Sequence, residues 1–332
     1  MINVIEIILE VIFPVILVCL LVIILVSGLS NEYNETDFMT LDEFMKDWLQ
    51  DHGQGHKLEK QFQTMKKEPT GIFYMPATYK GAKFFIKLGL TPNKVSLINL
   101  ISSFFIFYGV FMVGQGHILD LFTVQPFYGT WFIPLAVLVL FTGIIDGIDG
   151  AIARLLGTKS KSGAWFDNII DRISDILMLV GLIPGSMLIL SELGFNFEWI
   201  VWTNIFLIQI YEYMRARHEG LGLHELKPFI GERPVRIMLL ATSFMIYGIS
   251  SFSVLITSLI NPDATSLWTS THTSIITWTI LISQIILLAI MTLSSFQLGN
   301  YSFKKLKKMD NQTGETSKTN EQVIKQQEKQ KN

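Results

Sequence analysis

Four aspartates at short, regular intervals are the residues of this chain best suited to chemistry. The stretch that holds them, between two long apolar segments, reads Asp146-x2-Asp149-Gly150-x2-Ala153-Arg154-x8-Gly163-x3-Asp167-x3-Asp171. On helical spacing, Asp146 and Asp149 share one face of a helix, and Asp167 and Asp171 share one face of the next helix. Two facing carboxylate pairs of this kind can hold a divalent metal.

A simpler explanation is that these aspartates are solvated charges at helix ends, which are common at membrane edges. However, a carboxylate near the bilayer core costs up to about 2.5 to 3.5 kcal/mol even on the lenient insertion scale, so four of them need neutralising. Nearby basic residues offset part of this charge: Arg154, Lys159, Lys161 and Arg172. Hard oxygen ligands beside the small Gly150 and Ala153 favour Mg²⁺ or Mn²⁺, expected as two ions, holding a phosphate ester close to the backbone.

The composition indicates an all-α integral membrane protein. Of the 332 residues, 50% are hydrophobic and only 16% are charged, which is typical of a polytopic membrane protein. Apolar runs of membrane-spanning length occur near residues 3–28, 95–114, 130–149, 172–190, 197–213, 237–260 and 274–295. Each run is predicted to be one transmembrane helix, and no nucleic-acid partner is expected.

Connecting segments that contain Lys or Arg alternate along the chain with segments that contain neither. This distribution sets the predicted orientation. Basic residues occur in segments 29–94, 150–171, 214–236 and 303–332, whereas segments 115–129, 191–198 and 261–273 contain none. The basic segments therefore all fall on one side of the membrane. This places the N-terminus outside the cell membrane and puts the four aspartates and the C-terminus at the cytoplasmic side.

The chain divides into four predicted parts. They are an N-terminal transmembrane anchor (1–29), a cytosolic polar segment (30–79), a membrane domain (80–302) and a disordered cytosolic tail (303–332). A cleaved signal peptide is the alternative for this segment, but Glu6 and Glu10 replace the positive n-region of such a peptide, so a retained anchor is expected. Residues 80–90 are amphipathic and are predicted to lie in the headgroup layer. The tail is too polar to build a core.

His52 and His56 are a second pair with metal-ligand spacing. The glycines between them break a helix and no cysteine lies nearby, so we expect loop residues rather than a metal site.

The aspartate stretch resembles the signature of the CDP-alcohol phosphatidyltransferase family at every fixed position and every spacer length. Thr91-Pro92-Asn93 is similar to that family's Thr-Pro-Asn opening of the first core helix, and the resemblance covers roughly residues 80–300. It implies a homodimer with a six-helix transmembrane core preceded by an interfacial helix, so the first predicted span is an addition. It also implies a phospholipid-headgroup synthase that transfers a phosphatidyl-type group from a CDP-linked lipid to an alcohol and releases CMP.

The same resemblance implies roles for individual residues. Asp146, Asp149, Asp167 and Asp171 would hold the metal, and Asp171 would also be the general base. The CDP-lipid would contact Pro92, Asn93, Gly150, Ala153, Arg154, Ser160 and Gly163. An alternative for Thr91-Pro92 is an ordinary helix start. Asp175, one turn beyond Asp171, has two interpretations: it could extend the metal site, or it could have a structural role, which is the one we expect.

The acceptor is suggested by arginines at two predicted cytoplasmic helix ends, Tyr213-x-Arg215-Ala216-Arg217 and Gly231-Glu232-Arg233-Pro234-x-Arg236. Positive-inside topology alone can explain basic residues there, although arginine forks suit bidentate phosphate binding. The motifs resemble the branch of the family that uses inositol phosphate, which implies that Arg215 and Arg233 hold the acceptor phosphate. This chain departs from that branch at residues 292–296, which lack its late arginine, so glycerol 3-phosphate or another alcohol is the alternative acceptor.

Two further classes of protein fit the sequence less well. An ion-coupled transporter would place charge near the membrane midplane, whereas the acids here cluster at one side and the predicted outer loops carry no basic residue. An inactive relative that only binds ligand is disfavoured because all four aspartates are present.

Overall fold

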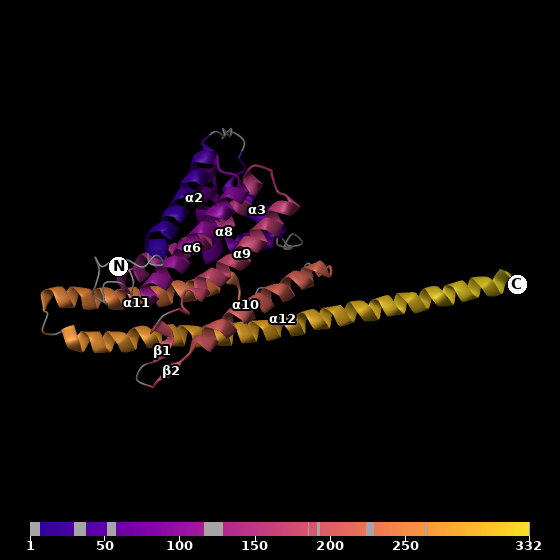
Figure 1. The fold of residues 1–332 in the computed structure, drawn as a ribbon. Coiled ribbons are helices and arrows are strands. Elements are labelled where there is room, and N and C mark those ends of the chain that lie inside the picture. The colour runs from indigo at the N-terminus through magenta and orange to yellow at the C-terminus, as the bar shows by residue number, and fades with distance from the viewer. Residues whose placement is uncertain are drawn as a thin grey trace.

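The computed structural model describes residues 7–29, 38–51, 58–115, 129–184, 186–190, 193–223, 229–261, 263 and 265–331. The described chain is almost entirely helical, which agrees with the predicted all-α class (Figure 1). One exception is a short antiparallel pair, β1 (Ile189–Leu190) with β2 (Phe195–Asn196), in which Ile189 lies opposite Asn196. His52 and His56 lie outside the described residues.

The helices follow one another along the chain. They are η1 (Ile8–Ile12), α2 (Phe13–Gly28), α3 (Leu41–Asp51), α4 (Leu58–Met65), η4 (Thr70–Tyr74), α5 (Met75–Lys87), α6 (Pro92–Gln115), α8 (Phe132–Leu155), α9 (Lys161–Val180), η6 (Ser186–Leu188), α10 (Glu198–Gly220), α11 (Arg233–Ile260) and α12 (Thr265–Lys331).

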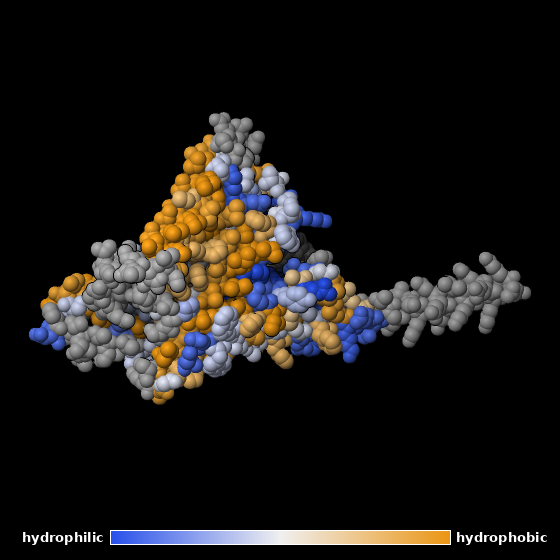
Figure 2. Space-filling model, viewed as in Figure 1, coloured by the Kyte–Doolittle hydropathy of each residue, from blue (hydrophilic) through white to orange (hydrophobic). Residues whose placement is uncertain are grey.

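Four described helices are long and apolar enough to cross a membrane, so the chain is a multi-pass membrane protein. These stretches are Pro92–Gly114, Phe132–Leu155, Arg233–Ile260 and Ser274–Asn311. Apolar side chains cover a broad area of the face shown in Figure 2, and hydrophilic residues gather towards α3 and the region between α9 and α10. The N-terminal α2 is apolar but shorter than these four.

The predicted span 172–190 is wrong in its second half. Helix α9 begins at Lys161 and ends at Val180, so it starts earlier and stops ten residues short of the predicted end. Gly181 and Pro184 follow directly, and both residue types disfavour continuation of a helix. Asp167 and Asp171 consequently lie well inside α9 rather than at its first turn.

Helix α8 is the centre of the packing around the aspartates. It contacts α5, α6 and α11, while α9 packs on α6 and α10, and α12 packs on α10 and α11. Phe132, Ile145 and Ile152 of α8 are fully buried and pack in these contacts. The stretch with Asp146 and Asp149 is therefore held by neighbours on several sides.

The tail also differs from its prediction, because α12 continues as a helix to Lys331 and extends past the other elements (Figure 1). Residues 303–332 contain no proline and are rich in Lys, Gln and Glu, which are good helix formers. The tail extends a helix that already exists, so it avoids the unfavourable nucleation step. High polarity excludes a core here but does not exclude a helix.

The polar segment before the membrane domain contains folded structure. Thr40 and Glu43 form a capping box at the start of α3, with Thr40 N–H donating to Glu43 Oε2 at 2.7 Å. The apolar face of α3 is buried against α5 and α8 through Phe44, Met45 and Leu49. Helix α5 begins at Met75, five residues before the predicted amphipathic stretch.

Helix α2 reaches this assembly at Gly28, where the next segment passes very close. A Cβ atom built on Gly28 would lie 2.4 Å from the Leu88 carbonyl oxygen and 2.8 Å from a Leu90 methyl carbon. Lys94 Nζ also donates to the Ser27 carbonyl at 2.9 Å. Glycine is therefore required for α2 to dock on the turn between α5 and α6.

We expect Gly28→Ala to loosen α2, because overpacking against backbone costs about 1–3 kcal/mol. The measurement is the melting temperature of the detergent-solubilised protein, which should fall, together with faster proteolysis near residue 30. Gly220→Ala is the matched control, since no atom lies within 4 Å of a Cβ built there. Equal melting temperatures for the two variants would contradict this packing role.

Candidate active site

The turn between α8 and α9 sets the relative position of the two aspartate pairs. Gly157, two residues after the end of α8, has a φ of 63°, and Thr158 N–H donates to the Ala153 carbonyl at 2.9 Å, as in a Schellman motif. Ser160 then caps α9 by accepting the Gly163 N–H at 3.0 Å. These local signals fold the signature into two helices joined by a short turn.

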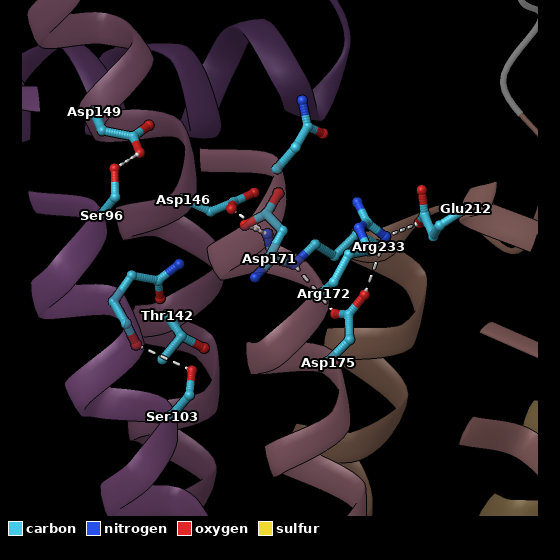
Figure 3. Close-up of polar contacts among 12 residues, drawn as sticks. Ser96, Ser103, Thr142, Asp146, Asp149, Asp171, Arg172, Asp175, Glu212 and Arg233 are labelled. Carbon is cyan, nitrogen blue, oxygen red and sulfur yellow. Dashed lines mark hydrogen bonds and ion pairs between the residues drawn. The ribbon is translucent and has the colours of Figure 1, made fainter. Parts of the chain in front are cut away.

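Three of the four aspartates converge. One carboxylate oxygen from each of Asp146, Asp167 and Asp171 lies within 4.8 Å of the others. Asp146 and Asp171 point towards one another from α8 and α9 in Figure 3. Hard oxygen donors so closely spaced fit Mg²⁺ or Mn²⁺, because like charges at this separation need a cation between them.

Asp149 is held differently. Its carboxylate accepts from Ser96 Oγ of α6 at 2.5 Å and from the Gly150 N–H at 2.5 Å (Figure 3). It is 5% exposed and also lies beside Asp167. The structure therefore joins Asp149 to the cluster through Asp167 rather than placing it among the three converging carboxylates.

Arg233 lies within this cluster. Its Nη1 contacts both Asp146 and Asp171, and its Nε lies 3.4 Å from Asp175 Oδ1. The Arg233 side chain is 9% exposed, and its Nη2 has no hydrogen-bond partner among the described residues. The guanidinium thus neutralises part of the carboxylate charge and has a buried donor available for a ligand oxygen.

A second charged network lies one turn further along α9. Arg236 Nη2 contacts Glu212 Oε1 at 2.8 Å and Asp175 Oδ2 at 3.0 Å, and Arg172 Nη1 contacts Glu212 Oε1 at 3.0 Å. The side chains of Asp175, Glu212 and Arg236 are each 6% exposed. These pairs give Asp175 the structural role that was one of its two interpretations.

Arg215, the other predicted acceptor residue, is paired with an acid of its neighbouring motif. Its Nη1 contacts Glu232 Oε2 at 2.5 Å, and Glu232 Oε1 also accepts from the Tyr211 hydroxyl at 2.9 Å. Glu232 immediately precedes Arg233, so the two predicted acceptor arginines belong to one connected corner of α10 and α11.

The predicted CDP-lipid residues line the same end of α8 and α9. A Cβ built on Gly163 would lie 2.9 Å from Ser160 Oγ and 3.6 Å from Asn93 Oδ1, so these residues are neighbours. Pro92 opens α6 beside them. A Cβ on Gly150 would lie 3.1 Å from Arg154 Nη1, which places the Arg154 guanidinium over Gly150. Ala153 is half-buried one turn after Asp149.

Sequence reasoning missed three residues of this region. Ser96 contacts Asp149, Glu212 holds two arginines, and the Tyr74 hydroxyl would lie 2.1 Å from a Cβ built on Gly147, between Asp146 and Asp149 in the chain. Glu212 carried a signal, since an acid in an apolar helix needs a partner. Ser96 and Tyr74 carried none, because neither residue type is unusual in its segment.

The sequence model of the CDP-alcohol phosphatidyltransferase family matches residues 89–293, which contain all four aspartates and both acceptor motifs. The chain belongs to the CDP-alcohol phosphatidyltransferase family. As a member it is a membrane transferase of phospholipid biosynthesis that acts on a CDP-linked alcohol. The family match excludes α3, α4 and Tyr74.

Relatives with specific names were also found. The chain is 30% identical over 163 residues to the archaetidylinositol phosphate synthase of Pyrococcus horikoshii, covering 48% of this chain and 71% of the relative. It is 29% identical over 199 residues to the phosphatidylinositol phosphate synthase of Mycobacterium marinum, covering 59% of this chain and 74% of the relative. A crystal structure of the Mycobacterium tuberculosis phosphatidylinositol phosphate synthase with manganese and citrate superposes with a TM-score of 0.47 and 22% identity, covering 68% of this chain and 88% of that one.

Removing one partner of the buried network should be costly. We expect Glu212→Gln to destabilise the protein by about 3–5 kcal/mol, because Arg172 and Arg236 lose a shared counter-charge in a buried setting. Thermal unfolding in detergent measures this. Glu219→Gln, an exposed change on the same helix, is the matched control, and equal melting temperatures for both variants would show that the network contributes little.

Proposed function

We propose that this protein transfers the phospholipid group of a CDP-linked lipid to inositol phosphate and releases CMP. The observation that carries the proposal is the convergence of Asp146, Asp167 and Asp171 with Arg233 in one site. The names of the two relatives support inositol phosphate as the acceptor.

The four aspartates are the proposed metal ligands, with Asp149 held next to the three that converge. Bound Mg²⁺ or Mn²⁺, expected as two ions, would neutralise the diphosphate and polarise its phosphoryl oxygens. The close carboxylate oxygens support this assignment. Among the described residues, Arg233 is the arginine that contacts Asp146 and Asp171, and one guanidinium leaves the cluster negatively charged.

The CDP-lipid is proposed to bind where α8 and α9 meet the start of α6. Gly150, Ala153 and Gly163 leave room for the nucleotide and its phosphates close to the backbone, and Arg154 supplies a fixed cation. The remaining contacts proposed for this substrate are Pro92, Asn93 and Ser160. The neighbouring positions of Asn93, Ser160 and Gly163 support a single binding surface.

Asp171 is the proposed general base. It takes the proton from an acceptor hydroxyl, whose oxygen then forms a bond to the lipid-linked phosphorus. The bond between that phosphorus and the CMP oxygen breaks, and CMP leaves with its electron pair. The Asp171 side chain is 13% exposed, which limits competition from bulk water for this proton transfer.

Arg215 and Arg233 are the proposed acceptor ligands. The Arg233 Nη2, which has no hydrogen-bond partner among the described residues, supports this role for Arg233. Arg215 contacts Glu232, the residue immediately before Arg233, so both arginines belong to the same corner of α10 and α11. At the predicted departure from the inositol phosphate branch, Ser294 Oγ accepts the Gly231 N–H at 2.8 Å and is fully buried. This packing leaves little room for an arginine there, so glycerol 3-phosphate is the alternative acceptor.

The proposed arrangement in the cell membrane has seven transmembrane helices, with the N-terminus outside and the active site and C-terminus in the cytoplasm. The alternation of Lys and Arg between connecting segments supports this orientation. Helix α5, with Lys80, Lys83 and Lys87, is proposed to lie in the headgroup layer, and the enzyme is proposed to work as a homodimer.

Asp167→Asn should abolish CMP release, because loss of a metal ligand shared by both helices should exceed the roughly 10²- to 10⁴-fold cost of losing a general base. The assay uses purified protein, CDP-diacylglycerol, Mn²⁺ and inositol phosphate. Asp310→Asn, an identical change at an exposed position of α12, should retain full activity. Normal turnover by Asp167→Asn would refute the metal assignment.

Arg215→Ala should raise the KM for inositol phosphate about 10- to 100-fold, the loss expected for charge-assisted hydrogen bonds. The KM for the CDP-lipid should change little in the same titrations. Arg217→Ala is the control, since Arg217 is exposed on the same helix. Equal rises in both KM values would indicate that Arg215 is structural.

A further inference from the structure

Helix α3 brings two carboxylates to the proposed CDP-lipid site. Asp47 and Asp51 are four residues apart and share one face of α3. Lys159 Nζ contacts Asp47 Oδ2 at 2.7 Å and Asp51 Oδ2 at 2.9 Å, and Arg154 Nη2 contacts Asp51 Oδ2 at 3.0 Å. This cluster joins a segment outside the family match to a residue of the family signature.

The contacts use one edge of the Arg154 guanidinium. Nε lies 3.4 Å from Asp47 Oδ2 and Nη2 contacts Asp51, whereas Nη1 is the nitrogen that lies over Gly150. The planar guanidinium is rigid, so the contact of Nη2 with Asp51 and the position of Nε beside Asp47 also set the position of Nη1. The Arg154 side chain is 13% exposed, so few other orientations are open to it.

The ion pairs are not what holds α3 in place. Phe44, Met45 and Leu49 are each 1–2% exposed in the core shared with α5 and α8, and the Tyr79 hydroxyl donates to the Met39 carbonyl at 2.8 Å. Ion pairs with partly exposed partners add little stability by comparison. The four charges therefore have a different consequence, which is to orient Arg154 and Lys159.

We propose that Asp47 and Asp51 are positioning residues that hold Arg154 and Lys159 ready for the diphosphate of the CDP-lipid. This rests on the proposed function and assigns a task to α3. Asp47 and Asp51 pair with Arg154, near the end of α8, and with Lys159, on the turn between α8 and α9. The segment before the membrane domain thus contributes to the part of the site proposed to bind the nucleotide.

The charge states of the group agree with this role. Burial would raise the pKa of Asp51, but the hydrogen bond from Lys159 and the charges of Arg154 and Lys159 outweigh it and lower that pKa. Burial likewise opposes the charge on Lys159, but Asp47 and Asp51 raise its pKa. Both partners are therefore ionised at neutral pH.

The test is steady-state kinetics of the full-length double variant Asp47→Asn/Asp51→Asn with CDP-diacylglycerol, inositol phosphate and Mn²⁺. We expect the KM for CDP-diacylglycerol to rise on the order of 10-fold, while kcat and the KM for inositol phosphate change less than about 2-fold. Asp47→Glu/Asp51→Glu, which keeps the charge, should recover most of the loss.

Asp42→Asn is the matched control, because Asp42 lies on the same helix and pairs with Lys66 at 2.7 Å, away from Arg154. An unchanged KM in the double variant overturns the proposal. A lower KM also overturns it, and would instead make α3 a competitor of the substrate for Arg154.

Binding separates this proposal from the proposed function. CDP-diacylglycerol should raise the melting temperature of the wild type and of Asp42→Asn, but should raise that of the double variant much less at the same concentration. If the wild type binds this lipid without releasing CMP, the proposed function fails and the positioning role still stands on the melting data. Equal shifts for all three proteins overturn the positioning role.

Discussion

Crowding of like charge between α8 and α9 is the constraint on which the rest of this structure depends. Asp146, Asp167 and Asp171 bring carboxylate oxygens within 4.8 Å of one another in a largely apolar protein. Repulsion at this distance favours unfolding or protonation unless cations approach. The helices around the site supply arginines, and the donor set fits a divalent metal.

The cations around the site form three groups. Arg233 contacts the aspartates directly, and Arg236 and Arg172 share Glu212 and Asp175. The third group, Arg154 near the end of α8 and Lys159 on the turn that follows, is paired with α3. Each group is paired with acids, and Asp175 links the first two groups, so the charges are ordered before any substrate binds. Ordered charge of this kind can stabilise a developing phosphate charge without further rearrangement.

Much of this could be predicted from the sequence, because strong local signals determine it. The signature spacing predicts two adjoining helices, and Gly157, Ser160 and Pro92 mark where helices end and begin. The span predicted at 172–190 failed because its apolar composition hid the breaks at Gly181 and Pro184. The prediction of a disordered tail differs from the structure for another reason, because high polarity excludes a core but does not lower helix propensity.

Contacts between distant segments were beyond sequence reasoning. Nothing in the acidic composition of α3 indicates that Asp51 meets Arg154, because that meeting depends on the apolar packing of Phe44 against α5 and α8. Arg233 illustrates the same limit. Its motif predicted phosphate binding, but only the fold places its guanidinium between Asp146 and Asp171.

The central claim is that the crowded carboxylates use a divalent cation to transfer a phospholipid group. The most direct measurement is CMP release from CDP-diacylglycerol by the purified wild-type protein, with inositol phosphate, across a titration of Mn²⁺ and Mg²⁺ against EDTA. The account predicts release that requires both the acceptor and the metal and that stops when EDTA is in excess. Release that continues unchanged in EDTA would contradict it.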